Sequence, residues 1–204
     1  MIAAIELALL AQLNAMGGTG PGTFGYTYQV LETFPDEFEE YLASVRNLRT
    51  PAAWVSWLGF SEGEDQGDDD GLTAVCRFVL VVAASNLRNE QNSRHGDGAV
   101  PGSFQLVEDA VRVLSENWLS PLTLVRPVSV RSARPIARSA QMKTQKLSLI
   151  AIELECTASF GTFDAELGQF RTLHADWDVP PLGNVVPPLP AENPDAEDLI
   201  QVPQ

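Results

Sequence analysis

The sequence predicts an α+β fold, a single domain in which a mixed, mainly antiparallel β-sheet is packed by two or three helices. Hydrophobic residues make up 45% and charged residues 20% of the 204 residues, which is typical of a globular protein with a core. Apolar residues recur at helical spacing in some segments and alternate in others. Residues 161–204 break both patterns with acids and prolines. We therefore expect a domain over residues 1–160 and an extended, proline-rich acidic arm over 161–204.

The first quarter of the chain predicts two helices and a short strand. Residues 2–14 place their apolar side chains on one helical stripe, and the glycine-rich stretch 16–22 ends this helix. A weak alternation over 26–31 predicts a short strand. The stretch from Thr33 to Asp36 combines a capping hydroxyl, a proline and an acid, which indicates the start of a second helix.

Two apolar segments joined by an acidic loop predict a long β-hairpin. Residues 52–60 are rich in aromatic and branched side chains, as strands are. Residues 72–85 are almost entirely apolar, which is typical of a central strand covered on both faces. The loop over 61–71 carries six acids, so we expect it to be solvated.

The second half of the chain predicts one helix between a loop and two strands. Residues 86–99 are polar and predict a surface loop. Pro127 and Pro135 place the strand over 122–134 at an edge of the sheet. Residues 146–160 alternate clearly, so one face of this strand is expected in the core. The helix that opens at 101–103 has an apolar stripe consisting of Phe104, Val107, Val111, Leu114 and Trp118, with Asp109 among the residues facing water.

Composition excludes several classes of function. The formal net charge is -14 and the pI is near 4.4, so nucleic-acid phosphates and anionic lipids would repel the surface. No apolar run approaches the ~20 residues of a membrane span, and the N-terminus lacks the basic region of a signal peptide. We expect a soluble, intracellular protein without a membrane partner.

The sequence predicts no catalytic, cofactor or metal site. Cys76 and Cys156 lie in apolar strands and are expected to be small core residues, and no close cysteine or histidine pair indicates zinc. The Asp68–Asp70 run does not fit a calcium loop, because Arg77 falls where the bidentate Glu belongs. His95 and Asp97 lack a nucleophile at a recognisable spacing. An acidic, metal-dependent enzyme using Asp68, Asp69, Asp70 and His95 remains the alternative from a different class.

A basic segment stands out in this acidic chain. Between residues 126 and 146 there are six bases and no acid, namely Arg126, Arg131, Arg134, Arg138, Lys143 and Lys146. These residues either form a face that binds an acidic partner, such as a second copy, or guard an edge strand against aggregation. In the arm, the apolar residues Trp177, Leu199 and Ile200 are candidates for docking. All nine residues are predicted to form subunit or partner contacts.

Several motifs in this order resemble the tail-terminator proteins of Mu-like transposable bacteriophages. They are the opening I-E-x-A-L-L-x-x-L pattern over 5–13, the turn and helix start over 94–106 (RHGDG…GSFQL), the Trp177, Pro180 and Pro181 group, and the terminal AEDLI over 196–200. The acidic loop over 61–71 has no counterpart in this resemblance.

The resemblance implies a structural virion protein rather than an enzyme. Such proteins form a hexameric ring of identical subunits at the head-proximal end of the tail tube and stop its polymerisation. They then offer a docking surface to head-completion or connector proteins, and DNA passes through the lumen without specific binding. The expected location is the virion tail after assembly in the host cytoplasm. A head-to-tail connector is the closest alternative, and an acidic DNA mimic that binds a basic host protein is another.

Overall fold

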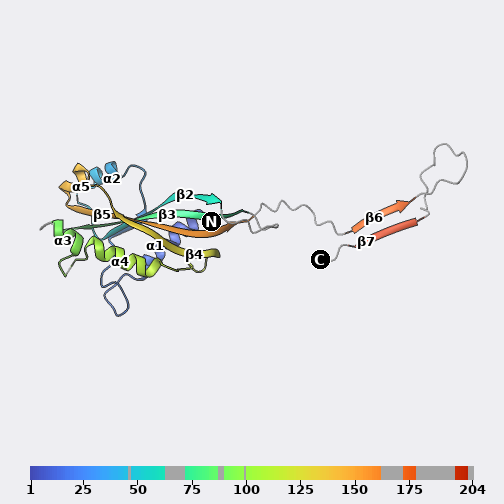
Figure 1. Ribbon diagram of the computed structural model, residues 1–204, viewed down its shortest axis with the longest axis horizontal. Helices are drawn as coiled ribbons and strands as arrows, with labels where there is room; N and C mark the ends of the chain where they lie inside the picture. The colour runs from blue at the N-terminus through green and yellow to red at the C-terminus, as the bar shows by residue number, and fades with distance from the viewer. Residues whose placement is uncertain are drawn as a thin grey trace, which may run out of the picture. The chain divides into compact units, whose positions relative to one another are not determined.

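A five-stranded mixed β-sheet organises the first of two compact units, Met1–Thr162, in the computed structural model (Figure 1). The structure describes residues 1–45, 47–62, 72–86, 90–98, 100–161, 172–177 and 196–201. The strand order is β1-β2-β3-β5-β4, in which only β1 and β2 are parallel. The strands are β1 (Val30–Thr33), β2 (Ala52–Glu62), β3 (Leu72–Ser85), β4 (Leu124–Pro135) and β5 (Leu147–Phe160). The predicted α+β class and mainly antiparallel sheet are confirmed.

The two longest strands lie side by side in the middle of the sheet. β3 and β5 pair over fourteen residues each, from Leu72 opposite Phe160 to Ser85 opposite Leu147. β2 pairs antiparallel with β3, as the predicted hairpin requires, and its register shifts between Trp57 and Gly59. β4 lies at the edge, as its prolines predict.

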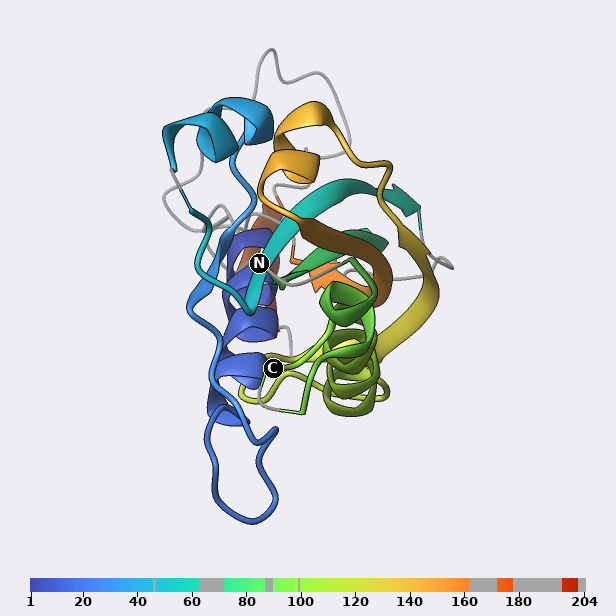
Figure 2. The same cartoon turned by 90° about the vertical axis from the view of Figure 1, so that its left-hand side faces the viewer.

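One face of the sheet is covered by α1 (Ile2–Ala15) and α4 (Ser103–Leu114), which enclose the larger core. Figure 2 shows these two helices on one side of the strands and α2 and α5 on the other. The alternation of β5 explains this core, because every second residue from Ile150 to Ala158 belongs to it.

The opposite face carries a smaller core under α2 (Phe38–Ser44) and α5 (Ala140–Thr144). Trp54 is fully buried there, and Phe38 and Tyr41 approach it edge-on. Gln145 joins the two helices: its Nε2 donates to the Leu42 and Val45 carbonyls at 2.9 and 3.1 Å. Its Oε1 accepts from the Leu48 N–H at 3.1 Å.

Three predicted elements of the first unit differ from the structure, which also contains the unpredicted helix α5. The strand predicted over 26–31 begins only at Val30, because Tyr26 and Tyr28 pack as an aromatic group with Phe24. The loop predicted over 86–99 contains a short helix, α3 (Glu90–His95), whose Ser93 hydroxyl accepts from the Asn86 N–H and donates to the Lys146 carbonyl.

The third difference concerns the register of α4. Its buried residues are Ser103, Leu106, Asp109, Ala110 and Leu114. Phe104 and Trp118, expected in the core, are 41% and 53% exposed, and the helix ends at Leu114. The predicted stripe was therefore wrong at both of its ends.

The second unit, Phe163–Gln204, contains a two-stranded antiparallel sheet. β6 (Thr172–Trp177) pairs with β7 (Ala196–Gln201), with Leu173 opposite Ile200 and Trp177 opposite Ala196. We expected no strands in this arm. Residues 162–171, 178–195 and 202–204 of the arm and residues 63–71 of the acidic loop lie outside the described residues. Of the helices that the structure describes, none has the length and apolar character to cross a membrane.

Candidate assembly surfaces

The six bases predicted as an interface lie on β4 and on the connection from β4 to β5. Arg126, Arg131 and Arg134 lie on β4, Arg138 lies between β4 and α5, Lys143 is in α5, and Lys146 directly precedes β5. The structure thus gathers three of them on the edge strand and spreads the other three over the connection to β5.

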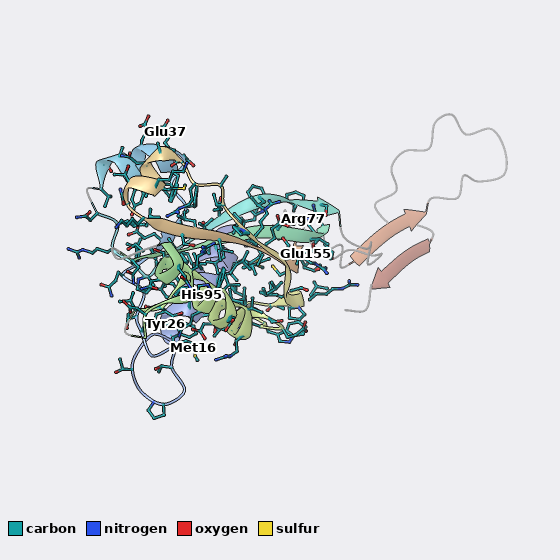
Figure 3. The ribbon with its side chains drawn as sticks, turned by 60° about the vertical axis from the view of Figure 1, so that its left-hand side comes forward. Met16, Tyr26, Glu37, Arg77, His95 and Glu155 are labelled. Atoms are coloured by element: carbon teal, nitrogen blue, oxygen red, sulfur yellow. The ribbon has the colours of Figure 1, made fainter. Side chains whose placement is uncertain are left out.

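The arginines of the edge strand bind acids of the neighbouring strand in the same chain. Arg131 forms an ion pair with Glu155, and Arg134 Nη2 lies 2.8 Å from Glu153 Oε1. Arg77 Nε, from β3, lies 3.8 Å from the other Glu155 oxygen, and Figure 3 shows Arg77 and Glu155 close together on the strands. The hydrogen bond that Arg131 donates to the Glu155 carboxylate raises the pKa of Arg131. The sequence did not reveal these pairs because Glu153 and Glu155 lie outside the basic segment.

The ion pairs leave the guanidinium groups open to a further partner. The side chains of Arg131 and Arg134 are 57% and 71% exposed, and an arginine has five N–H donors, more than one carboxylate uses. Arg131 also lines a cleft of 250 Å³, together with Glu116, Arg126 and Thr157 among others. This side of the sheet is therefore a polar surface with exposed cationic groups.

A second surface is apolar and was not predicted from the sequence. Trp57, Phe60 and Leu72 are 39%, 49% and 45% exposed, although large apolar side chains are usually buried. By register they share the sheet face of the larger core, since Trp57 is opposite the buried Phe78 and Phe60 is opposite Cys76. Phe60 stacks at a tilt with Phe160 of β5, 5.9 Å between ring centres.

This apolar sheet end, defined as Trp57, Leu58, Phe60, Leu72 and Phe160, continues the core beyond its helical cover. Leu58 is the extra residue at the register shift of β2 and is 57% exposed. A β-bulge of this kind re-aims side chains at a sheet edge or end. The signal in the sequence is the aromatic-rich WVSWLGF segment, whose composition predicts a strand but not an exposed apolar surface.

The turn between α3 and α4 has a structural role in the described contacts. Asp97 Oδ1 accepts from the Val100 N–H and Oδ2 from Asn86 Nδ2, both at 3.0 Å. The His95 ring packs edge-on against Phe104, 5.2 Å between centres. His95 and Tyr26, labelled in Figure 3, line a cleft of 300 Å³ at the low end of ligand-site volumes.

The metal-enzyme alternative depends on residues of which the structure describes only some. Among the described residues, no three His, Cys, Asp or Glu side chains are grouped as metal ligands. Asp68, Asp69 and Asp70 lie outside those residues, so that alternative is untested. Cys76 and Cys156 are buried core residues, as predicted, and burial raises the pKa of Cys156 to about 12.

The family model described as Bacteriophage Mu, Gp37 matches residues 1–161. The chain belongs to the Bacteriophage Mu Gp37 family. No curated protein matches the chain. The matched region of this Gp37 family member contains the whole five-stranded sheet and ends one residue after β5. Both the edge-strand arginines and the apolar sheet end lie within it.

Trp177, Leu199 and Ile200 lie beyond the region that defines the Gp37 family match. The structure places Trp177 on β6 and Leu199 and Ile200 on β7, so all three belong to the paired strands of the second unit. Their assignment to an interface stays a prediction, as does that of the six bases.

Proposed function

We propose that this Gp37 family protein is a phage tail terminator. It forms a ring, hexameric by the sequence resemblance, on the head-proximal end of the tail tube, stops the polymerisation of the tube and presents a docking surface for the head or its connector. Two facts support this proposal: the chain belongs to a family of phage Mu, and its motifs resemble those of tail terminators.

The apolar sheet end is the structural observation that carries the proposal. Contiguous exposed aromatic and aliphatic side chains are a common mark of a protein-binding surface. Here they extend an existing core, so a partner that covers them would complete that core. We assign this surface to the tube end, where a terminator must bind in place of the next tube ring.

The mechanism is competition for a binding surface without a chemical step. One face of the ring occupies the growing end of the tube, and the other face lacks the surface that a tube subunit would need. The net charge of -14 suits a channel for DNA, because phosphates find few cations there to replace their counterions.

Deleting the gene and examining the lysate by negative-stain electron microscopy tests the role. Overlong tubes beside filled, tailless heads are expected for a terminator. Tails of normal length that fail to join heads would assign the protein to the connector layer instead. Normal phage would contradict both structural roles.

Complementation of the deletion then tests the apolar sheet end. Leu58→Asp is expected to leave overlong tubes, because it puts a charge at the proposed contact with the tube. Leu7→Asp is the matched control, since Leu7 is also exposed, at 63%, but lies on α1. If Leu58→Asp restores normal tails as well as Leu7→Asp does, the tube contact lies elsewhere.

A further inference from the structure

The outer edge of β4 is open to a further strand. β4 ends the five-stranded sheet, and no other described strand pairs with its outer side. At Val128 the edge is closed by backbone hydrogen bonds with Glu116 and Asn117, at 2.8 and 2.9 Å. The next six residues, Ser129 to Arg134, contain no proline. Their outward N–H and C=O groups can bind an added strand.

The two-stranded hairpin of the second unit would gain stability from pairing with such an edge. β6 and β7 have six residues each and, among the described strands, pair only with each other. Two strands alone are at best marginally stable in water, whereas three or more with an apolar face can be stable. The chain therefore contains both an unfilled edge and a hairpin of matching length.

The register of the hairpin gives it two unlike faces. Residues paired across an antiparallel sheet share a face, and neighbours along a strand alternate. One face holds Leu173, Ala175, Trp177, Ala196, Asp198 and Ile200, which is mostly apolar. The other holds Asp176 directly opposite Glu197, together with Thr172, His174, Leu199 and Gln201.

The edge strand has the same division between its faces. Val130 packs against the larger core, whereas Arg131 and Arg134 reach Glu155 and Glu153 on the opposite face. If the hairpin extends the sheet at β4, its apolar face continues the core side. Its Asp176–Glu197 pair then lies on the same side as the exposed guanidinium groups. In this one arrangement the apolar face of the hairpin meets the core side of the sheet, and its acidic pair meets the guanidinium groups.

We propose that the C-terminal hairpin of one copy adds to the β4 edge of a second copy, with Asp176 and Glu197 facing Arg131 and Arg134. This inference rests on the ring of the proposed function and supplies its subunit contact. Donor and acceptor are different surfaces of the chain, so the contact is head-to-tail, and such contacts close into a ring when the rotation allows it.

Two full-length charge-reversal variants test the contact. The hairpin variant carries Asp176→Lys and Glu197→Lys, and the edge variant carries Arg131→Glu and Arg134→Glu. We expect the wild-type protein to self-associate in analytical ultracentrifugation and each variant to lose affinity by ~100-fold or more, because like charges then face each other. An equimolar mixture should associate again, since each variant supplies the surface that complements the other.

Recovery in the mixture distinguishes exchange between copies from docking within one chain, which mixing cannot restore. A matched control, Arg49→Glu with Arg94→Glu, makes the same charge change as the edge variant at two exposed positions off β4, and it should associate like the wild type. The hairpin variant leaves the first unit unaltered, so its loss of association cannot come from a misfolded body.

The proposal is overturned if the mixture stays monomeric, if either variant associates like the wild type, or if the wild type itself never associates. Failure here and failure of the proposed function are distinguishable. Overlong tubes in the deletion phage together with unchanged association of the variants would keep the terminator role and reject this contact. Normal tails in the deletion phage together with recovery in the mixture would keep this contact and reject the terminator role.

Discussion

Gly102 is the described glycine with the least room for a side chain. A Cβ there would lie 2.2 Å from the Arg94 carbonyl oxygen and 2.3 Å from the Gly96 nitrogen, and both are backbone atoms that cannot turn away. This contact lets α4 begin directly against the end of α3. It also gives a physical reason for glycine in the GSFQL motif.

We expect Gly102→Ala to destabilise the protein by at least ~1–3 kcal/mol, the usual cost of forcing extra atoms into a packed site. Urea unfolding followed by circular dichroism measures this loss. Gly20→Ala is the control, because a Cβ at Gly20 meets nothing within 4 Å. Equal stability of the two variants would show that the α3–α4 contact adjusts easily.

Asp109 is a buried acid that sequence periodicity assigned to water. The Tyr26 hydroxyl donates to its Oδ2 at 3.2 Å, and Arg112 lies 3.5 Å from its Oδ1. Burial is the largest cause that raises the pKa of Tyr26, and burial also raises the pKa of Tyr28 to about 12. The folded state therefore favours the neutral form of both phenols.

This difference predicts a loss of stability at alkaline pH. Below pH 10, the ordinary pKa of tyrosine, the contribution is fully present; above it the unfolded chain ionises first, and the contribution is lost as the pH rises toward the folded values. The double variant Tyr26→Phe, Tyr28→Phe should have a flatter decline of unfolding free energy between pH 10 and 11 than the wild type. An equally steep decline of the unfolding free energy in both proteins would mean that groups other than these two tyrosines cause the alkaline loss of stability.

At the scale of elements, α4 buries a different apolar stripe from the one predicted from the sequence, which begins at Phe104. Leu106 is fully buried, whereas Phe104 is 41% exposed. Leu106→Ala should therefore cost ~2–5 kcal/mol, as for other deletions in a core. Phe104→Ala should cost at most about 1.5 kcal/mol, the contribution of its aromatic contact with His95. Thermal unfolding measures the stability loss of each variant. A larger loss for Phe104→Ala than for Leu106→Ala would support the apolar stripe predicted from the sequence.

Elements with a strong pattern were predictable, and those held by distant partners were not. β3 has the predicted bounds, Leu72–Ser85, because its apolar run needs cover on both faces and only a central strand provides it. α3 has no apolar periodicity, and Ser93 fixes it through bonds to Asn86 and Lys146. Such a contact, which joins residues 53 positions apart, leaves no local signal in the sequence.

The candidate surfaces were predictable only in part, for the same reason. The basic segment was visible because its charges follow one another along the chain. Their partners Glu153 and Glu155 become neighbours only when β4 pairs with β5. The apolar sheet end depends on where α1 and α4 stop, and a strand pattern does not record the length of the helices above it.

At the scale of the whole molecule, the two units should unfold independently. Each has its own sheet, and the first contains both described cores. Truncation after Thr162 should leave the calorimetric midpoint of the remaining protein unchanged in dilute solution. A contribution of 1 kcal/mol from the second unit would appear as a drop of ~2–4 °C. Any such drop would show that the arm stabilises its own body.

Gln145 connects α2 and α5 through a single amide group, and this has a consequence for local motion. Its three hydrogen bonds reach the Leu42 and Val45 carbonyls and the Leu48 N–H, so they form and break together when one side chain moves. The Leu48 amide follows α2 in the chain and belongs to no helix or strand, yet its hydrogen exchange should be as slow as the joint opening of both helices. The helices α2 and α5 would then open together, as one cooperative unit.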